Sequence, residues 1–192
     1  ALIPRPETED LAEWLLKNAA FPAAGRILDM GSGSGVLGLT LAAERPDAQV
    51  TLADISPDAL SLARENAQSL AIANAAFVES DLFTHLGGQT FDLIVANLPY
   101  VPEADRATLT REVMHDPALA LFSGPDGMDL IRRFVPAALE HLVPGGWLAL
   151  EIGYDQSAVT EALLRAAGFT DVLTISDLSG IPRFPVSRRP GA

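Results

Sequence analysis

The sequence of 192 residues contains no cysteine. Disulfide bonds, thiolate catalysis and cysteine-ligated metals are therefore excluded, and a reducing, cytoplasmic setting is expected. The three histidines, His85, His115 and His141, lack the spacing of a zinc motif, so we expect no metal. No apolar run approaches the roughly twenty residues that cross a membrane, and the start does not resemble a signal peptide. We therefore expect a soluble protein without a membrane partner.

Basic residues are scarce as well. The chain has 13 Lys and Arg against 25 Asp and Glu, which gives a formal net charge of -12. Because nucleic-acid binding normally needs clustered cations, this balance argues against a nucleic-acid partner. Hydrophobic residues make up 48% of the chain, enough for a substantial core. We expect one domain over residues 1–192 and a monomer.

Short apolar segments alternate with segments of helical periodicity, which predicts an α/β fold with a mostly parallel sheet and helices on both faces. Strands are predicted at residues 26–30, 49–53, 75–78, 91–96 and 147–152, with a turn at 144–146. Helices are predicted at residues 7–21, 36–43, 57–70, 127–141 and 154–167. The last segments, 171–175 and 184–187, are expected to pair as late antiparallel strands.

A glycine-rich segment at residues 31–35, here called the glycine loop, directly follows the first predicted strand. Glycines let the backbone turn tightly and bring its N–H groups close to a ligand at the next helix N-terminus. A tight turn without a ligand is the alternative. Asp54 ends the second strand about twenty residues later, where a carboxylate can bind a ribose diol. Together they predict an adenosine-containing cofactor.

The spacing of the glycines separates two cofactor classes. A dinucleotide loop reads G-x-G-x-x-G, whereas the third glycine here comes one residue early, at Gly35, and Gly38 offers a less regular alternative. This favours S-adenosylmethionine, with S-adenosylhomocysteine as the product, and leaves an NAD-dependent oxidoreductase as the distant alternative.

Other acidic residues complete the predicted cofactor site. Asp81 is suited to accept a hydrogen bond from the adenine amine, with Leu82 as apolar cover, although it could instead cap a helix. Asp29 can assist the ammonium of a methionine moiety or fix the glycine turn. The candidate cofactor residues lie at or just after strand ends: Asp29, Gly31, Ser32, Gly33, Ser34, Gly35, Asp54, Ile55, Asp81, Leu82 and Asn97.

The motif Asn97-Leu98-Pro99-Tyr100, here called the NLPY motif, follows the fourth predicted strand. The Asn97 side-chain oxygen and the Leu98 carbonyl can each accept one N–H of a planar NH2 group. Pro99 stiffens the backbone, and Tyr100 offers an aromatic face. We therefore interpret these four residues as the catalytic and substrate-binding site, with an ordinary turn as the alternative.

Taken in order, the glycine loop, Asp54, Asp81 and the NLPY motif resemble class I S-adenosylmethionine-dependent methyltransferases. Residues 3–9 (Ile-Pro-Arg-Pro-Glu-Thr-Glu), 116–121, 124–127 and 151–156 narrow the resemblance to peptide-chain release factor glutamine N5-methyltransferases. The resemblance covers essentially the whole chain.

The resemblance implies a Rossmann-like, seven-stranded class I methyltransferase fold and methylation of the glutamine side chain in the Gly-Gly-Gln motif of release factors. The release factor would be the protein partner. Two departures stand out. Position 98 is leucine where the family usually has proline, and the family's N-terminal helical domain is absent, so we interpret the chain as a catalytic domain.

The main alternative is an adenine N6-methyltransferase acting on RNA or DNA, because adenine also presents a planar NH2 and such enzymes carry similar motifs. The charge of -12 and the Arg5-Pro6-Glu7-Thr8 segment argue against it. Residues 87–89 read Gly-Gly-Gln, the substrate motif itself. We interpret that segment as a turn and not as a site of self-methylation.

Overall fold

The computed structural model describes residues 6–107 and 121–191. In this part of the chain the strands are β1 (Arg26–Met30), β2 (Gln49–Asp54), β3 (Ala75–Glu79), β4 (Phe91–Asn97), β5 (Leu142–Glu151), β6 (Thr170–Ser176) and β7 (Pro182–Arg188). The helices are α1 (Pro6–Asn18), α2 (Val36–Glu44), α3 (Pro57–Ser69), α4 (Asp129–His141) and α5 (Ser157–Ala167), with a short 3-10 helix at Glu103–Ala107.

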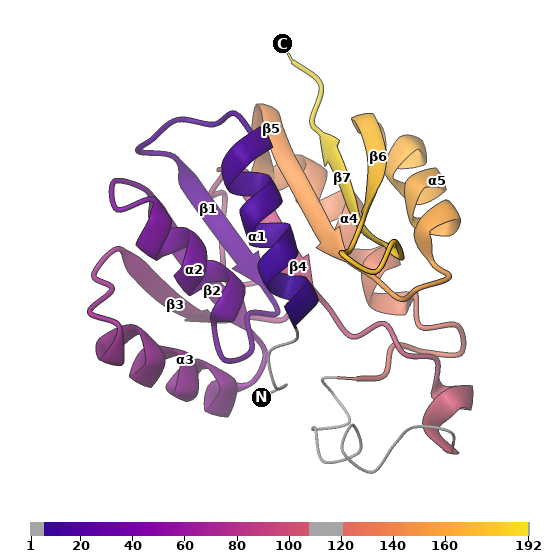
Figure 1. The fold of residues 1–192 in the computed structure, drawn as a ribbon, viewed down its shortest axis with the longest axis horizontal. Helices are drawn as coiled ribbons and strands as arrows, with labels where there is room; N and C mark the ends of the chain where they lie inside the picture. The colour runs from indigo at the N-terminus through magenta and orange to yellow at the C-terminus, as the bar shows by residue number, and fades with distance from the viewer. Residues whose placement is uncertain (1–5, 108–120, 192) are drawn as a thin grey trace.

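The strands form one seven-stranded sheet in the order β3-β2-β1-β4-β5-β7-β6 (Figure 1). Strands β1 to β5 run parallel, whereas β7 is antiparallel to both of its neighbours, β5 and β6. The structure thus confirms the predicted α/β class with a mostly parallel sheet and a late antiparallel strand. It also confirms each predicted strand and helix, with shifts at several ends.

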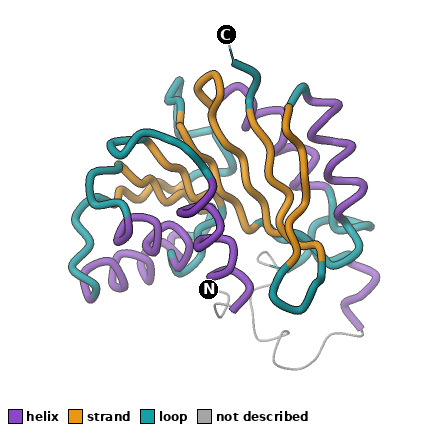
Figure 2. Tube along the Cα trace, turned by 45° about the horizontal axis from the view of Figure 1, so that its top comes forward, coloured by secondary structure: helices purple, strands orange, loops and turns teal. Residues whose placement is uncertain are grey.

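Both faces of the sheet are buried, because successive side chains of each strand point in opposite directions. On one face Ile27, Leu93 and Val95 pack with α1, α2 and α3. On the other face Leu28 and Ile94 pack with α4 and α5. Figure 2 shows the sheet between these two helical layers. The near-continuous apolar strands of the sequence reflect this burial on both sides.

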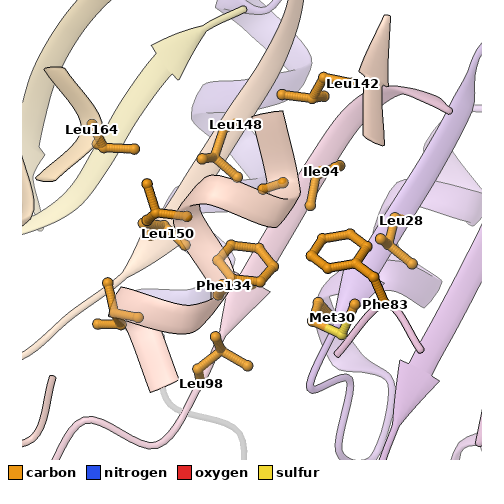
Figure 3. Close-up of a cluster of buried hydrophobic side chains, with 14 of the residues drawn as sticks. Leu28, Met30, Phe83, Ile94, Leu98, Phe134, Leu142, Leu148, Leu150 and Leu164 are labelled. Atoms are coloured by element: carbon orange, nitrogen blue, oxygen red, sulfur yellow. The ribbon is translucent and has the colours of Figure 1, made fainter. Parts of the chain in front are cut away.

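Figure 3 shows the core on the α4 side, where Phe134 of α4 lies over strands β4 and β5. Phe83 stacks on Phe134 with ring centroids 5.5 Å apart. Leu98, the second residue of the NLPY motif, is only 5% exposed and belongs to the same cluster. The proposed substrate-binding segment is therefore anchored in the core by an apolar side chain.

The start of α3 follows from its sequence. The Ser56 hydroxyl accepts a hydrogen bond from the Ala59 backbone N–H at 3.2 Å, and Pro57 occupies the first helical position. Both features satisfy or remove donors that a helix start leaves unpaired. They hold α3 directly after β2, which fixes the place of the Asp54 carboxylate at the strand end.

Strand β5 differs from the prediction. Residues 144–146 were expected as a turn before a strand, but β5 runs through them from Leu142 to Glu151. The pairing register with β4 shifts at this point, and Gly145 has φ +78°. Arg188 stabilises the irregularity by donating two hydrogen bonds to the Gly145 carbonyl, at 2.9 and 3.1 Å. A Pro-Gly-Gly sequence here makes a bulge inside a strand.

Two helices begin later than expected, α4 at Asp129 and α5 at Ser157. Before α5, residues 153–156 form a turn in which the Gln156 N–H donates to the Gly153 carbonyl at 3.1 Å. None of the helices in the described part of the chain is long and apolar enough to cross a membrane.

Candidate functional site

A cavity of about 540 Å³ opens at the carboxyl ends of β1, β2 and β4. Strands β1 and β4 are neighbours in the sheet although two other strands separate them in sequence. At such a point the chain connections leave in opposite directions, which creates a crevice at the strand ends where ligands bind in open α/β sheets. The cavity has the size of a small-molecule site.

The cavity brings together nearly all of the predicted site residues. Its wall contains, from the predicted set, Asp29, Gly31, Ser32, Gly33, Ser34, Asp54, Ile55, Asp81, Leu82, Asn97, Leu98, Pro99 and Tyr100. Gly35 is not in the wall. It stands at the N-cap of α2 with φ +87°, and a Cβ there would lie 2.9 Å from the Leu52 side chain.

The glycine loop is held against the end of β2. The backbone N–H groups of Gly31 and Ser32 both donate to the Ala53 carbonyl, at 2.8 and 3.1 Å. Gly31 has φ +69°, and an added Cβ would lie 2.9 Å from the Leu98 side chain. Gly33 has φ +56°, and an added Cβ would meet nothing within 4 Å. The loop thus touches the NLPY motif on one side and leaves Gly33 facing open space.

The Asp54 carboxylate is oriented by two backbone donors. Oδ2 accepts from the Gly33 N–H and Oδ1 accepts from the Ser56 N–H, both at 2.8 Å. Each oxygen has a second lone pair, so the carboxylate can still accept from a ligand. These bonds tie the glycine loop to the start of α3 and fix the acidic group at the cavity wall.

Asp29 is 2% exposed and lies behind the glycine loop. Its Oδ2 accepts a hydrogen bond from the Gly38 N–H of α2 at 2.8 Å, so this carboxylate fixes the start of the helix, whereas the predicted bond was to the glycine turn. Burial, with a smaller contribution from the nearby Asp54 charge and only partly offset by that hydrogen bond, raises the pKa of Asp29 from 3.8 to about 7. Asp29 is therefore a titratable group of the cavity near neutral pH.

Asp81 also lies in the cavity wall, and its carboxylate forms an ion pair with Arg133 of α4 at 3.1 Å. No helix starts at Asp81 in the structure, so capping is not its role. Arg133 lines the cavity as well, although sequence reasoning did not identify it. Its position depends on how α4 packs against the sheet, which no local motif reveals.

The NLPY motif begins at the end of β4, where Asn97 pairs in register with Glu151 of β5. After the motif, the Val101 N–H donates to the Leu121 carbonyl at 2.9 Å, and Val101 forms a parallel bridge with Phe122. The Tyr100 carbonyl accepts a hydrogen bond from the Gln156 side chain at 2.9 Å. The motif is thus fixed at both of its ends.

Thr8 of α1 is a further cavity residue outside the predicted set. Its hydroxyl donates to the buried Glu151 carboxylate at 2.8 Å, which ties the start of α1 to the end of β5. In α3, the Asn66 side chain donates to the Ser34 carbonyl at 2.9 Å and supports the glycine loop from outside. Both contacts join segments far apart in sequence.

Residues 87–89 lie just before β4, at the edge of the sheet opposite the cavity. They are exposed, and the Gln89 N–H closes a turn onto the Leu86 carbonyl at 3.3 Å. The interpretation as a turn is confirmed. Because β4 spans about 20 Å at roughly 3.3 Å per residue, Gln89 cannot reach the cavity of its own chain.

Within residues 6–107 and 121–191, no group of three acidic or histidine side chains could hold a metal ion. Parts of the family-like segments, residues 3–5 and 116–120, lie outside the described residues. The same holds for His115.

Comparison with known proteins identifies the family. A family model described as the methyltransferase small domain matches residues 7–126. The release factor glutamine methyltransferase of Deinococcus radiodurans is 48% identical over 191 residues, which cover 100% of this chain and 68% of that protein. The chain belongs to the release factor glutamine methyltransferase family. The protein of the same name from Caulobacter vibrioides is 50% identical over 182 residues, covering 93% of this chain and 62% of its own length.

This methyltransferase chain therefore spans about two thirds of the length of those relatives. Family membership does not favour the adenine alternative. Among solved structures, the ribosomal protein L11 methylase of Lactobacillus delbrueckii subsp. bulgaricus has a TM-score of 0.72 at 23% identity and covers 97% of this chain and 80% of that one.

An RNA methyltransferase of Salinibacter ruber, solved in complex with S-adenosyl-L-homocysteine, has a TM-score of 0.63 at 18% identity and covers 99% of this chain and 95% of that one. At these identities the likenesses show the fold alone, which is the Rossmann-like fold of class I methyltransferases.

Proposed function

We propose that this chain transfers a methyl group from S-adenosylmethionine to the side-chain amide nitrogen (N5) of the glutamine in the Gly-Gly-Gln motif of peptide-chain release factors. The observation that carries the proposal is a single cavity whose wall contains both the glycine loop and the NLPY motif, in a chain of this family. Donor and acceptor would meet inside that cavity.

The residues of the cavity fit the cofactor. Asp54 would bind the ribose diol, Asp81 the adenine amine, and Ile55 and Leu82 would cover the ring. The buried Ser32 hydroxyl has no hydrogen-bond partner among the described residues and remains for a ligand. The glycine loop leads into the N-terminus of α2, which favours a carboxylate. Asp29, which also lines the cavity, would assist the ammonium group.

The cofactor would supply a methyl group already activated by the sulfonium. The chain must then hold the glutamine nitrogen in line with that methyl group. An amide nitrogen is a poor nucleophile, because its lone pair is delocalised. Asn97 Oδ1 and the Leu98 carbonyl would each accept one N–H of the amide, which orients the nitrogen and favours the positive charge that develops on it. The proton would leave to water after transfer.

The proposal also covers the domain organisation, the oligomeric state and the cellular compartment. We propose one catalytic domain over residues 1–192, acting as a monomer on a protein substrate in the cytoplasm. The absence of cysteine fits a reducing compartment. The charge of -12 fits a protein substrate better than a nucleic acid.

A radiolabelled methyl-transfer assay tests the proposal. A release factor, the same factor with its motif glutamine changed to alanine, and ribosomal RNA are offered separately, and mass spectrometry locates the methyl group. Label on the glutamine of the unmodified factor alone supports the proposal. Label on RNA and none on the factor would overturn it.

Asn97→Ala should lower methylation by about 100-fold or more, since the variant loses one acceptor of the amide. Its affinity for S-adenosylmethionine should stay within about threefold, because the other cofactor contacts remain. Asn18→Ala, at the exposed end of α1, is the matched control. Full methylation by the Asn97 variant would refute the role of Asn97.

A further inference from the structure

The Gln156 side chain connects three loops around the NLPY motif. It is 5% exposed, and all of its hydrogen-bond partners are backbone groups. Oε1 accepts from the Gly153 N–H at 2.9 Å, and Nε2 donates to the Tyr100 carbonyl at 2.9 Å and the Asp126 carbonyl at 3.4 Å. Only an amide supplies an acceptor on one side and two donors on the other.

Gly127 packs against the same carbonyl, beside the Gln156 side chain. It has φ +75°, and an added Cβ would overlap the Tyr100 carbonyl oxygen and lie 2.8 Å from Gln156 Nε2. A side chain at position 127 would therefore push this carbonyl away from its hydrogen bond. Gln156 bonds the Tyr100 carbonyl, and Gly127 leaves the space that this bond needs; we call this arrangement the Tyr100 clamp.

The first two residues of the NLPY motif are held by the sheet and the core. Asn97 is the last residue of β4 and is held by its register with Glu151, while the Leu98 side chain is buried in the core. Between this anchored start and the clamped carbonyl lies only Pro99. Because Pro99 restricts the backbone between them, the position of the Tyr100 carbonyl would set the orientation of the Leu98 carbonyl and the hydrogen-bonding geometry beside the Asn97 side chain.

We propose that Gln156 is a positioning residue for methyl transfer, and that it acts with Gly127 through the Tyr100 carbonyl to set the geometry of the NLPY motif. This inference rests on the proposed function for its catalytic consequence. It assigns a role to the turns before α4 and α5, which contain Gly127 and Gln156 and none of the proposed cofactor-binding residues.

Gln156→Glu tests the hydrogen bond with almost no change of shape. A carboxylate would place a second oxygen against the Tyr100 carbonyl, whereas a protonated carboxyl can donate to it. At pH 8 we expect kcat to fall by about 10- to 100-fold, with the KM for S-adenosylmethionine within about twofold of wild type. The ratio of variant to wild-type kcat should rise as the pH falls, which a loss of packing would not produce.

Gly127→Ala tests the same contact by adding a methyl group next to the hydrogen bond, and Gly124→Ala is its matched control. Both glycines belong to the same loop and have nearly equal φ angles, +75° and +74°. The three atoms nearest to a Cβ at position 124 would all belong to the Asp129 carboxylate, a side chain that can move. We expect Gly127→Ala to lose at least about tenfold in kcat and Gly124→Ala less than about twofold.

A signal independent of methylation separates this inference from the proposed function. The chain has two tyrosines, so carbonyl-labelled tyrosine gives two carbon signals in an NMR spectrum. Gln156→Glu should shift the Tyr100 signal and the Asn97 side-chain amide signal. Thr160→Ala, a buried change in α5, the helix that follows Gln156, should shift neither the Tyr100 signal nor the Asn97 signal.

If the wild-type protein methylates no release factor while these NMR signals shift as expected, the proposed function is wrong. The effect of Gln156 on the geometry of the NLPY motif is then still supported. The clamp is overturned if Gly127→Ala and Gly124→Ala lose kcat equally. It is also overturned if low pH fails to restore Gln156→Glu, or if the Asn97 signal does not respond.

Discussion

Burial of the Asp29 carboxyl should make the stability of this protein depend on pH in an unusual direction. Its pKa is raised from 3.8 to about 7, mainly because the group is removed from water behind the glycine loop. The folded state therefore holds a proton between pH 4 and pH 7 that the unfolded chain releases. Stability from this group is present at low pH and is lost as the pH rises towards 7.

The size of the effect follows from the shift. Between pH 5 and pH 7 the slope approaches about 1.4 kcal/mol per pH unit and falls to half as the pH reaches the folded-state pKa, so the free energy of unfolding should fall by about 2 kcal/mol. For a domain of this size that corresponds to a decrease in Tm of about 4–8 °C. The lowered pKa values of Asp126 and Asp177 act below their ordinary value of 3.8, outside this range.

Asp29→Asn removes the titration but keeps an oxygen that can accept from the Gly38 N–H. Its Tm should therefore change much less than that of wild type between pH 5 and pH 8, and comparing the two proteins removes the contributions of the ionisable groups that they share. Asp92→Asn is a matched control, since Asp92 accepts a backbone hydrogen bond from Arg26 at the opposite edge of the sheet. An equal pH slope in wild type and Asp29→Asn would refute the reasoning.

Two further predictions concern the contact between the glycine loop and the NLPY motif. Gly31→Ala should destabilise the ligand-free protein by about 1–3 kcal/mol more than Gly33→Ala. Both glycines have a positive φ, but only a Cβ at position 31 would contact the Leu98 side chain. Equal Tm values for the two variants would contradict this prediction. Leu98→Pro should cost about 1–3 kcal/mol of stability through lost core packing while methylation is retained, since the carbonyl remains. Loss of methylation in a fully folded Leu98→Pro protein would show that the side chain itself is needed.

The sequence predicts well the carboxyl ends of β1, β2 and β4 and the loops that follow them, because the relevant signals are local. An apolar run followed by Gly-Ser-Gly or by Asn-Leu-Pro-Tyr marks both the strand and the ligand-facing loop after it. Parallel strands then bring such loops to one edge, so Asp54, Asp81 and Asn97 meet in one cavity as expected.

The residues that sequence reasoning missed act across long distances in the chain. Arg133 reaches Asp81 from α4, and Gln156 reaches the Tyr100 carbonyl from the turn before α5. Their contacts depend on the packing of helices against the sheet, which periodicity does not specify. The β5 bulge was missed for a related reason. Pro-Gly-Gly favours a turn locally, but the partners on β4 and β7 keep the strand continuous.

The NLPY motif alone does not distinguish a glutamine amide from an adenine amine, because both present a planar NH2 to the same two acceptors. Discrimination must therefore come from the walls beside the motif. Thr8 belongs to such a wall, and its hydrogen bond to Glu151 holds the start of α1 at the strand end that pairs with Asn97. Thr8 thus connects the start of α1 to the strand pair that carries the NLPY motif, through one buried carboxylate.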